Sequence, residues 1–389
     1  GYLGFFLPKE KQTAKKWIYF LALFLSTASL SVQLFFISGS ILLSILALLP
    51  SYMASKVFIH FLLAPIFRDD YRPRLRHDLP AVRKTPVCVT VPTILFEKEL
   101  REFPSLLERL YLQNREQSAC FGMLFDLPEA KKAQEEEDRA LFSKVEQAVE
   151  KLNERYGSRF YAVIRQRTFS KTQNTYLGRD RKRGAIEDLV DWMGGEEKDS
   201  LRLFGFLNWE SRYLLTLDYD TEPQIGALER LVAVALHPEN APRFDEQGRM
   251  IGGYGVFSPA MTHLPTKGFD TPFGRLLLSL DVTRRYPSTH HELYQDLFQS
   301  GSFCGKGLMD LEVYRKRLSG KMPPEEVLSH DLLEGAVLKA CYVSDLSFSE
   351  SQPDTVLSYL NREHRWIRGD WQLFRAASLF PIAGIDRYK

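Results

Sequence analysis

The chain has 389 residues, with 51 lysines and arginines against 49 aspartates and glutamates, for a formal net charge of +2. Such balanced charge lacks the basic excess of a nucleic-acid-binding domain, so we expect no nucleic-acid partner. The length allows about two domains. The cysteines have no metal-binding spacing, so we expect buried, reduced thiols in a cytosol-facing domain: Cys88, Cys120, Cys304 and Cys341.

An apolar region lies near the N-terminus. Residues 17–49 include no charged side chain, and the apolar character resumes after Lys56. A membrane-spanning helix needs about 20 apolar residues, so the region is long enough for two. We predict a membrane region over residues 1–67, with two transmembrane helices and a turn near residues 38–40. One long span followed by an interfacial helix is the alternative.

Basic residues flank the apolar region on both sides. They are Lys9, Lys11, Lys15 and Lys16 before it, and Arg68, Arg72, Arg74, Arg76, Arg83 and Lys84 after it. Basic flanks favour the cytoplasmic side of a membrane, and two spans would place both flanks there. We therefore expect a basic linker over residues 68–85 and a cytoplasmic domain after it.

Apolar runs alternate with helical patterns over the rest of the chain. Buried strands are predicted at 86–93, 120–126, 160–165 and 213–217, and helices at 100–112, 129–156 and 224–236. This order predicts an α/β domain over residues 86–372, a mostly parallel sheet flanked by helices. Residues 373–389 turn apolar again, which indicates an interfacial helix or the start of a further membrane segment.

Two carboxylates, Asp218 and Asp220, directly follow a predicted strand. In open α/β sheets, ligands bind beyond the carboxyl ends of the strands. Mg²⁺ and Mn²⁺ prefer oxygen ligands and commonly bridge phosphates, so the pair predicts a metal that neutralises a departing diphosphate. The alternative is an exposed turn with no ligand.

Other polar residues are predicted at the same sheet edge. Thr93 and Asp126 each stand at the end of a strand, and a basic run over residues 179–184 contains Lys182 and Arg183. Arginine and lysine bind phosphates through charge-assisted hydrogen bonds, so this run is a candidate phosphate site. An exposed basic loop, or a patch at a membrane surface, is the alternative.

Asp331 is the candidate general base. Transfer to a sugar hydroxyl needs a carboxylate within hydrogen-bond reach of the hydroxyl proton. Asp331 and Glu334 are three residues apart, which places them on one face of a helix. The alternative is an ordinary first-turn acid in a helix capped by Ser329.

Arginine and tryptophan alternate over residues 362–371, which include Arg365, Trp366 and Trp371. Arginine matches phosphate geometry and tryptophan stacks on sugars, so we expect diphosphate and acceptor contacts here. The alternative is a segment at the depth of lipid headgroups. Gly305 belongs to a glycine-rich loop, which we assign to the acceptor side or to a structural turn.

The order of these motifs resembles that of processive family-two-like glycosyltransferases, although Arg362 stands where cellulose synthases have glutamine. The chain is more similar to the glycosyltransferase module of cyclic beta-1,2-glucan synthases. The similar segments are VPTIL (91–95), RKRG (181–184), HPENAPRFDEQGRMIGGYGVFSP (237–259), YQDLFQSGSFCGKG (294–307), LSHDLLEG (328–335) and HRWIRGDWQ (364–372).

The resemblance implies an A-type glycosyltransferase fold that transfers glucose from UDP-glucose to a beta-1,2-glucan acceptor with inversion. It implies a bacterial inner membrane, with the catalytic domain on the cytoplasmic side of the lipid bilayer. It also implies further glycan-processing domains of a longer chain.

The resemblance assigns roles to the motif residues as well. Asp331 would be the base, and Asp218 and Asp220 would hold the metal and the diphosphate. Asp126 would meet the uridine or ribose, with Thr93, Lys182 and Arg183 near the nucleotide. Arg365 and Trp366 would lie at the diphosphate and acceptor end, with Trp371 and Gly305 on the acceptor.

Three other functions are consistent with some of these features. A membrane-bound processive beta-glycosyltransferase could use a different donor or make a different linkage. A metal-dependent nucleotidyl- or phosphotransferase would explain the paired aspartates and the basic run. A non-catalytic membrane scaffold would be expected to lack at least one of the motif acids, and all of them are present.

Overall fold

The computed structural model describes residues 9–63, 72–264, 271–280, 292–322, 325 and 331–378. The chain divides into two compact units. The described elements of the first unit are α1, α2, α3 and α10, and the second unit contains the other elements.

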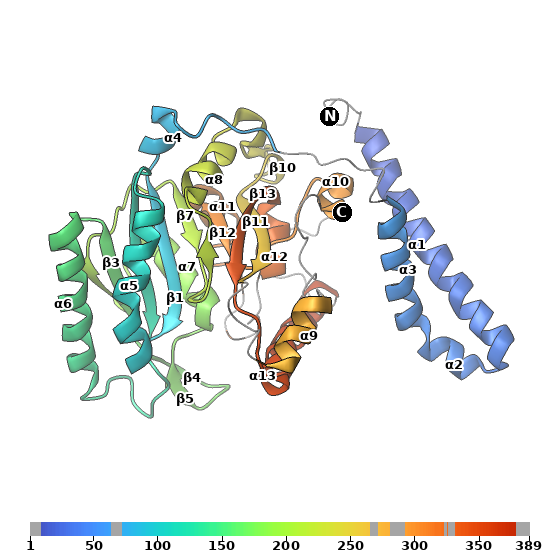
Figure 1. Ribbon diagram of the computed structural model, residues 1–389, viewed down its shortest axis with the longest axis horizontal. Helices are drawn as coiled ribbons and strands as arrows, with labels where there is room; N and C mark the ends of the chain where they lie inside the picture. The colour runs from blue at the N-terminus through green and yellow to red at the C-terminus, as the bar shows by residue number, and fades with distance from the viewer. Residues whose placement is uncertain are drawn as a thin grey trace. The chain divides into compact units, whose positions relative to one another are not determined.

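The first unit contains the apolar N-terminal helices, with bounds α1 (Lys9–Ser38), α2 (Ile41–Leu46) and α3 (Leu48–Leu63). The chain breaks between α1 and α2 at Gly39, whose φ is +65°. The turn that was predicted near residues 38–40 is therefore confirmed. The helices α1 and α3 lie side by side (Figure 1), and the Tyr19 hydroxyl and His60 Nε2 are 2.9 Å apart.

One described helical stretch, Trp17–Ser38, is long and apolar enough to cross a membrane, judged by length and composition. Its apolar side chains are largely exposed: the exposed fraction is 78% for Phe36 and 83% for Ile37. The helix α3 is also apolar but has 16 residues, fewer than the roughly 20 that a span requires. The second transmembrane helix therefore stays a prediction.

The short helix α10 (Leu293–Phe298) packs within this first unit. Leu297 is buried with Tyr19, Leu23 and Ile59. The α/β domain predicted over residues 86–372 included this segment, because nothing local in it indicates a contact with helices more than 200 residues earlier.

The second unit is built on a nine-stranded sheet with the order β6-β3-β2-β1-β7-β12-β11-β13-β8. Neighbouring strands among β3, β2, β1 and β7 are parallel, as are β11 and β13, whereas β6, β12 and β8 pair antiparallel. The bounds are β1 (Val87–Ile94), β2 (Ala119–Asp126), β3 (Phe160–Arg165), β6 (Leu201–Gly205), β7 (Tyr213–Thr216), β8 (Glu222–Pro223), β11 (Val256–His263), β12 (Gly307–Asp310) and β13 (Ala340–Glu350).

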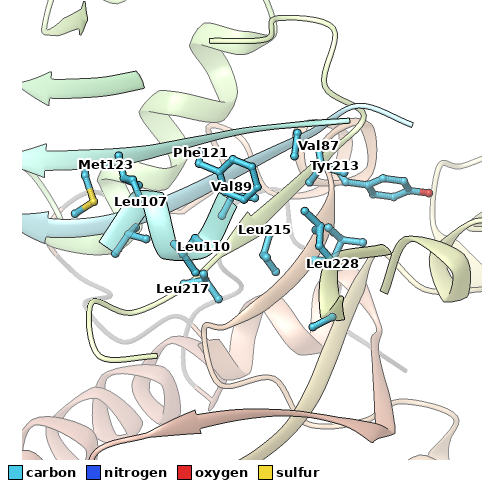
Figure 2. Packing of buried hydrophobic residues seen from close by; sticks show 14 of the residues in the cluster. Val87, Val89, Leu107, Leu110, Phe121, Met123, Tyr213, Leu215, Leu217 and Leu228 are labelled. Carbon is cyan, nitrogen blue, oxygen red and sulfur yellow. The ribbon is translucent and has the colours of Figure 1, made fainter. Parts of the chain in front are cut away.

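Helices cover both faces of this sheet because the side chains of each strand alternate between them. In β1, Val87, Val89 and Val91 pack on one face with α5, α6 and α8, and Cys88 packs on the other with α7, α11 and α12. Figure 2 shows part of the first core. The bounds are α5 (Glu97–Gln113), α6 (Asp138–Tyr156), α7 (Arg181–Met193), α8 (Ala227–Ala235), α11 (Leu311–Arg317) and α12 (Asp331–Leu338).

The other described α-helices and strands are α4 (Pro80–Lys84), β4 (Thr168–Ser170), β5 (Thr175–Leu177), β9 (Arg243–Phe244), β10 (Met250–Gly252), α9 (Pro272–Leu280) and α13 (Val356–Ser378). The strands β4 and β5 form a hairpin. The helix α13 is continuous across the boundary that was predicted at residue 372.

The α/β class with a large, mostly parallel sheet flanked by helices is confirmed, and the four strands predicted from apolar runs are all present. The helix predicted over residues 129–156 begins only at Asp138. The preceding segment contains bends, a turn and an isolated bridge instead, in which Ala130 pairs with Tyr176 through two backbone hydrogen bonds of 3.0 Å. All four cysteines are buried, as expected.

Candidate active site

The parallel strands β1, β2 and β7 bring their carboxyl ends to one edge of the sheet. Asp126 is the last residue of β2 and pairs in register with Ile94 at the end of β1. Thr93 is half-buried and directly precedes Ile94 in β1. Asp218 comes two residues after the end of β7. The expectation that these residues share one sheet edge is therefore confirmed.

The Asp218 carboxylate is held between two lysines. Lys182 Nζ lies 2.6 Å from Oδ1, and Lys306 Nζ lies 3.0 Å from Oδ2. Burial alone would raise the pKa of Asp218, but the two ammonium groups outweigh burial and hold that pKa well below its usual range. Asp218 is consequently ionised at neutral pH, and each of its oxygens has a cationic partner.

Lys306 was not singled out from the sequence. Its Nζ also lies 2.6 Å from Oε2 of Glu350, the last residue of β13. Burial alone would lower the pKa of Lys306, but Asp218 and Glu350 outweigh burial and raise that pKa well above its usual range. Glu350 is 44 residues from Lys306, so no local pattern could have indicated this pair.

Asp220 is more exposed than Asp218. Burial raises its pKa, and the nearby carboxylates Asp218 and Glu350 raise it further, against the opposing effect of Lys306. Carboxylates that repel one another in this way are stabilised by a cation placed between them. Their oxygens therefore fit the ligand preference of Mg²⁺ or Mn²⁺.

The described residues contain no group of three or more histidine, cysteine, aspartate or glutamate side chains arranged to hold a metal ion. A cation at Asp218 and Asp220 would consequently need further oxygen ligands from water or from a bound phosphate. Mg²⁺ is commonly bound in this way, through one or two carboxylates and the phosphates of a substrate.

Gly305 joins Asp331 to this cluster. The Gly305 carbonyl oxygen accepts hydrogen bonds from Lys182 Nζ at 3.0 Å and from Thr216 Oγ1 at 3.2 Å. A Cβ atom at Gly305 would lie 2.7 Å from Oδ1 of Asp331, the first residue of α12. Asp331 also helps to raise the pKa of Lys182. The structure thus brings together Lys182, Asp218, Gly305 and Asp331.

The carboxylate of Asp126 is bound by a buried arginine. Arg165 Nε and Nη2 lie 2.6 and 2.9 Å from the two oxygens of Asp126, and Arg165 Nη1 lies 3.0 Å from Asp188 Oδ2. Burial raises the pKa of Asp126, and the pairing with Arg165 opposes that effect. A Cβ atom at Gly178 would lie within 2.4 Å of the Asp126 carboxylate, so this backbone also encloses it.

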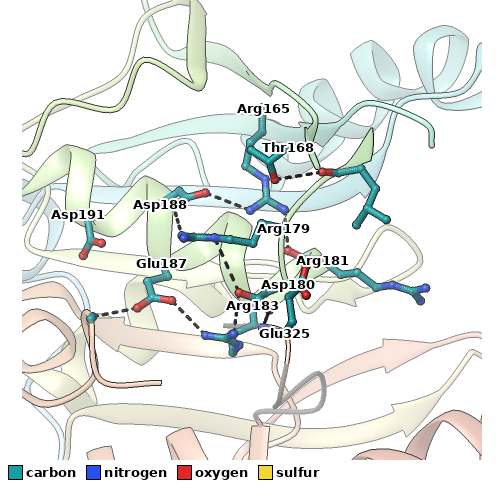
Figure 3. Close-up of polar contacts among 12 residues, drawn as sticks. Arg165, Thr168, Arg179, Asp180, Arg181, Arg183, Glu187, Asp188, Asp191 and Glu325 are labelled. Atoms are coloured by element: carbon teal, nitrogen blue, oxygen red, sulfur yellow. Dashed lines mark hydrogen bonds and ion pairs between the residues drawn. The ribbon is translucent and has the colours of Figure 1, made fainter. Parts of the chain in front are cut away.

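Arg183 belongs to the same group of ion pairs, because Arg179 contacts both Asp188 and Asp180 (Figure 3). The Arg183 guanidinium is 2.8 Å from Asp180 and 3.1 Å from Glu187, and its side chain is 1% exposed. Lys182 and Arg183 are adjacent in sequence, yet only Lys182 reaches Asp218. The spacings i, i+3 and i, i+4 of these acids around Arg183 were visible in the sequence and could have indicated the pairing.

The predicted diphosphate and acceptor residues Arg365, Trp366 and Trp371 all lie on α13. The Arg362 guanidinium lies 4.8 Å from the centre of the Trp366 ring, and Trp371 is exposed. Two other residues of α13, four positions apart, line a pocket of about 760 Å³ together with the β4–β5 hairpin and the segment that leads into Lys182. They are Arg368 and Gln372.

Ser329, the predicted helix cap of the alternative reading of Asp331, lies outside the described residues. Asp331 itself is the first residue of α12. This position agrees both with a general base and with an ordinary first-turn acid. Its contact with the Gly305 loop is the feature that an ordinary first-turn acid does not require.

No protein-family model matches the chain. The cyclic beta-(1,2)-glucan synthase NdvB of Rhizobium meliloti is 30% identical over 293 residues, which is 73% of this chain. The chain spans about 10% of the length of that relative. The extent of this match, over most of the chain and a small part of the relative, identifies the chain as a cyclic glucan synthase-related module.

Proposed function

We propose that this chain is an inverting glycosyltransferase that adds glucose from UDP-glucose to a beta-1,2-glucan. Homology to a cyclic beta-(1,2)-glucan synthase supports the glycosyltransferase role. The observation that carries the proposal is the meeting of Lys182, Asp218, Gly305 and Asp331 at the carboxyl edge of the sheet. An A-type glycosyltransferase fold is part of the proposal and agrees with the mostly parallel sheet.

The donor would bind with its diphosphate at Asp218 and Asp220. These carboxylates would hold Mg²⁺ or Mn²⁺, and the metal would supply positive charge against the diphosphate as it leaves. Lys182 would add a fixed positive charge, because its ammonium group already lies in this cluster. Arg365 would contact the diphosphate from α13.

The nucleoside would lie toward the ends of β1 and β2. Thr93 and Asp126 are placed there by the parallel register of the strands. A carboxylate oxygen can accept more than one hydrogen bond, so the pairing of Asp126 with Arg165 leaves acceptor capacity for uridine or ribose. Arg183 would act indirectly: its ion pair with Asp180 would hold the start of α7, which carries Lys182.

Asp331 would act as the general base. In a single displacement, the acceptor hydroxyl oxygen bonds to the anomeric carbon of glucose while the bond from that carbon to the diphosphate oxygen breaks. The hydroxyl proton passes to the Asp331 carboxylate, and UDP leaves with the bonding electron pair. A carboxylate in this position contributes about 10²- to 10⁴-fold to such a transfer.

The acceptor glucan would approach between the Gly305 loop and α13. Gly305 lies against Asp331, so a sugar hydroxyl at Asp331 would also face this loop. Trp366 and Trp371 would supply aromatic faces for sugar rings. We also propose that the apolar helices α1 and α3 anchor the chain in the bacterial inner membrane, with the second unit on the cytoplasmic side, where nucleotide sugars are found.

The proposal is tested by glucose incorporation. Purified full-length chain would receive labelled UDP-glucose, Mg²⁺ or Mn²⁺, and beta-1,2-gluco-oligosaccharides, and the length of the labelled glycan would be measured. We expect metal-dependent chain growth, abolished by Asp220→Asn. Hydrolysis of the donor without glycan growth would instead support the phosphotransferase alternative, and growth from a different nucleotide sugar would correct the donor.

Replacing Gly305 with alanine should abolish most of this activity. Its φ of +77° is costly for an L-residue, by about 1–3 kcal/mol, and the new Cβ would lie 2.7 Å from Asp331 Oδ1. The base would have to move, so we expect the rate of transfer to fall at least about tenfold, since misplacement by about 1 Å costs up to about 100-fold. The measurement is the initial rate at saturating donor.

Gly320→Ala is the matched control. Gly320 also has a positive φ, +68°, but nothing lies within 4 Å of its Cβ position. Both variants should therefore lose stability from the positive φ, Gly305→Ala by more because of the close approach to Asp331, and only Gly305→Ala should lose activity. Equal activity losses in the two variants would show that backbone strain, and not the position of Asp331, limits the reaction.

A further inference from the structure

Lys306 is the nearly buried cation of the site that the proposed mechanism does not use. Its side chain is 9% exposed and its ammonium group lies between Asp218 Oδ2, at 3.0 Å, and Glu350 Oε2, at 2.6 Å. A buried lysine needs such partners, because an unpaired ammonium group in this environment would lose its hydration without compensation.

The position of Lys306 limits how a metal can use Asp218. Both oxygens of that carboxylate already have ammonium partners, Lys182 on Oδ1 and Lys306 on Oδ2. A divalent cation that binds Asp218 would lie beside two ammonium groups whose charge repels it, so its binding is favoured when one of them moves away. Lys306 can be displaced without losing all its partners, because Glu350 still holds its charge.

A displaced Lys306 ammonium group would remain beside the phosphates of a nucleotide bound at Asp218. Phosphate oxygens that replace the Asp218 carboxylate as its partner would restore a charge-assisted hydrogen bond. Glu350 keeps the ammonium group in place during this exchange of partners. Lys306 directly precedes Gly307, which pairs with Thr216 of the neighbouring strand, so the sheet holds the backbone next to Lys306.

We propose that Lys306 is a diphosphate-binding residue that competes with the divalent cation for Asp218 while no nucleotide is bound. The inference rests on the proposed function, in which a nucleoside diphosphate occupies this cluster. It makes the metal and the donor mutually dependent: the metal displaces Lys306 from Asp218, and the diphosphate gives the displaced ammonium group a new partner.

The proposal predicts changes of opposite sign in Lys306→Met. Without nucleotide, Mn²⁺ should bind the variant more tightly than the wild type, by about tenfold, because no Lys306 charge competes for Asp218. With a metal chelator present, UDP should bind the variant about 10- to 100-fold more weakly, because a charge-assisted hydrogen bond is lost. Isothermal titration calorimetry on the full chain measures both affinities.

Lys198→Met is the matched control. Lys198 also lies between two carboxylates, 3.1 Å from Asp191 and 3.2 Å from Glu196, and it is not part of the site. Its loss should leave both affinities unchanged. Lys306→Arg, which retains the charge, should retain most of the UDP affinity.

A purely structural role of Lys306 would lower both affinities together, and that result, or unchanged UDP affinity, would overturn the proposal. If Lys306→Met fails to fold, Lys306→Gln, which can still hydrogen-bond to Glu350, provides the same two titrations. Failure of the wild type to bind UDP, with or without metal, would overturn the proposed function itself. The wild-type titration alone gives that result, so it is distinguishable from a failure of the Lys306 proposal.

Discussion

Asp331→Asn is expected to lower the rate of glucose transfer by about 10²- to 10⁴-fold, the range in which a positioned general base contributes. Asparagine has nearly the same shape as aspartate but cannot take the acceptor proton. Asp331 lies beside Gly305 and helps to raise the pKa of Lys182, so it faces the cluster that contains Asp218. UDP affinity should stay within a few-fold of the wild type, since binding does not require the base.

Glu312→Gln separates this role from that of an ordinary first-turn acid. Glu312 occupies the first turn of α11 as Asp331 occupies that of α12, but it is exposed. A first-turn acid stabilises its helix by about 0.3–1 kcal/mol through the helix dipole. Both variants should lose about that amount in thermal unfolding, and only Asp331→Asn should lose activity. Wild-type activity in Asp331→Asn would disprove the assignment of the base.

Arg165→Met is expected to lower the free energy of unfolding of the second unit by about 3–5 kcal/mol, the usual cost of breaking a buried ion pair by removing one partner. Arg165 is 1% exposed and binds Asp126 through two hydrogen bonds and Asp188 through a third. Methionine fills a similar volume but leaves both carboxylates without their shared cation. Chemical denaturation followed by circular dichroism measures the loss.

Arg155→Met is the control for this prediction. Arg155 Nη1 lies 2.8 Å from Glu108 Oε1, but the arginine side chain is 68% exposed, and such surface pairs stabilise by about 0–1 kcal/mol. A loss of similar size in both variants would mean that burial of the Arg165 group has no special effect on stability.

The pH dependence of Arg165→Met provides a second measurement. Without Arg165, the folded-state pKa of Asp126, already raised by burial, would rise further above the unfolded value. An acid of this kind favours the folded state at low pH and loses that contribution as pH rises through its folded pKa. The deficit of the variant should therefore be smaller at about pH 5 than at about pH 8.

The central strands could be predicted from the sequence because they are buried on both faces. β1, β2, β3 and β7 are short, continuous apolar runs, and such runs are typical of parallel sheets covered by helices. The order of elements then placed Asp126 and Asp218 at one sheet edge. The strand β13 was missed because its apolar run is only four residues long, Ala340 to Val343, and polar residues are frequent in the rest of it.

The partners of the charged residues could not be predicted in the same way. Arg183 belongs to a basic run that suggests an exposed phosphate site, but nearby acids bury its guanidinium. Arg165 lies in a strand, and its contact with Asp126 depends on how β2 and β3 pair. Lys306 and Glu350 meet only because β12 and β13 are built into one sheet.

The packing of α10 has a practical consequence for work with shortened forms of the chain. A version that begins at Arg72 would remove Tyr19, Leu23 and Ile59, the residues that bury Leu297. The polypeptide that leaves α10 continues within a few residues to Gly305 and Lys306. Such a truncated form would therefore expose an apolar helix directly upstream of the loop that contacts Asp331, and a loss of activity in it should not be attributed to the absence of lipid alone.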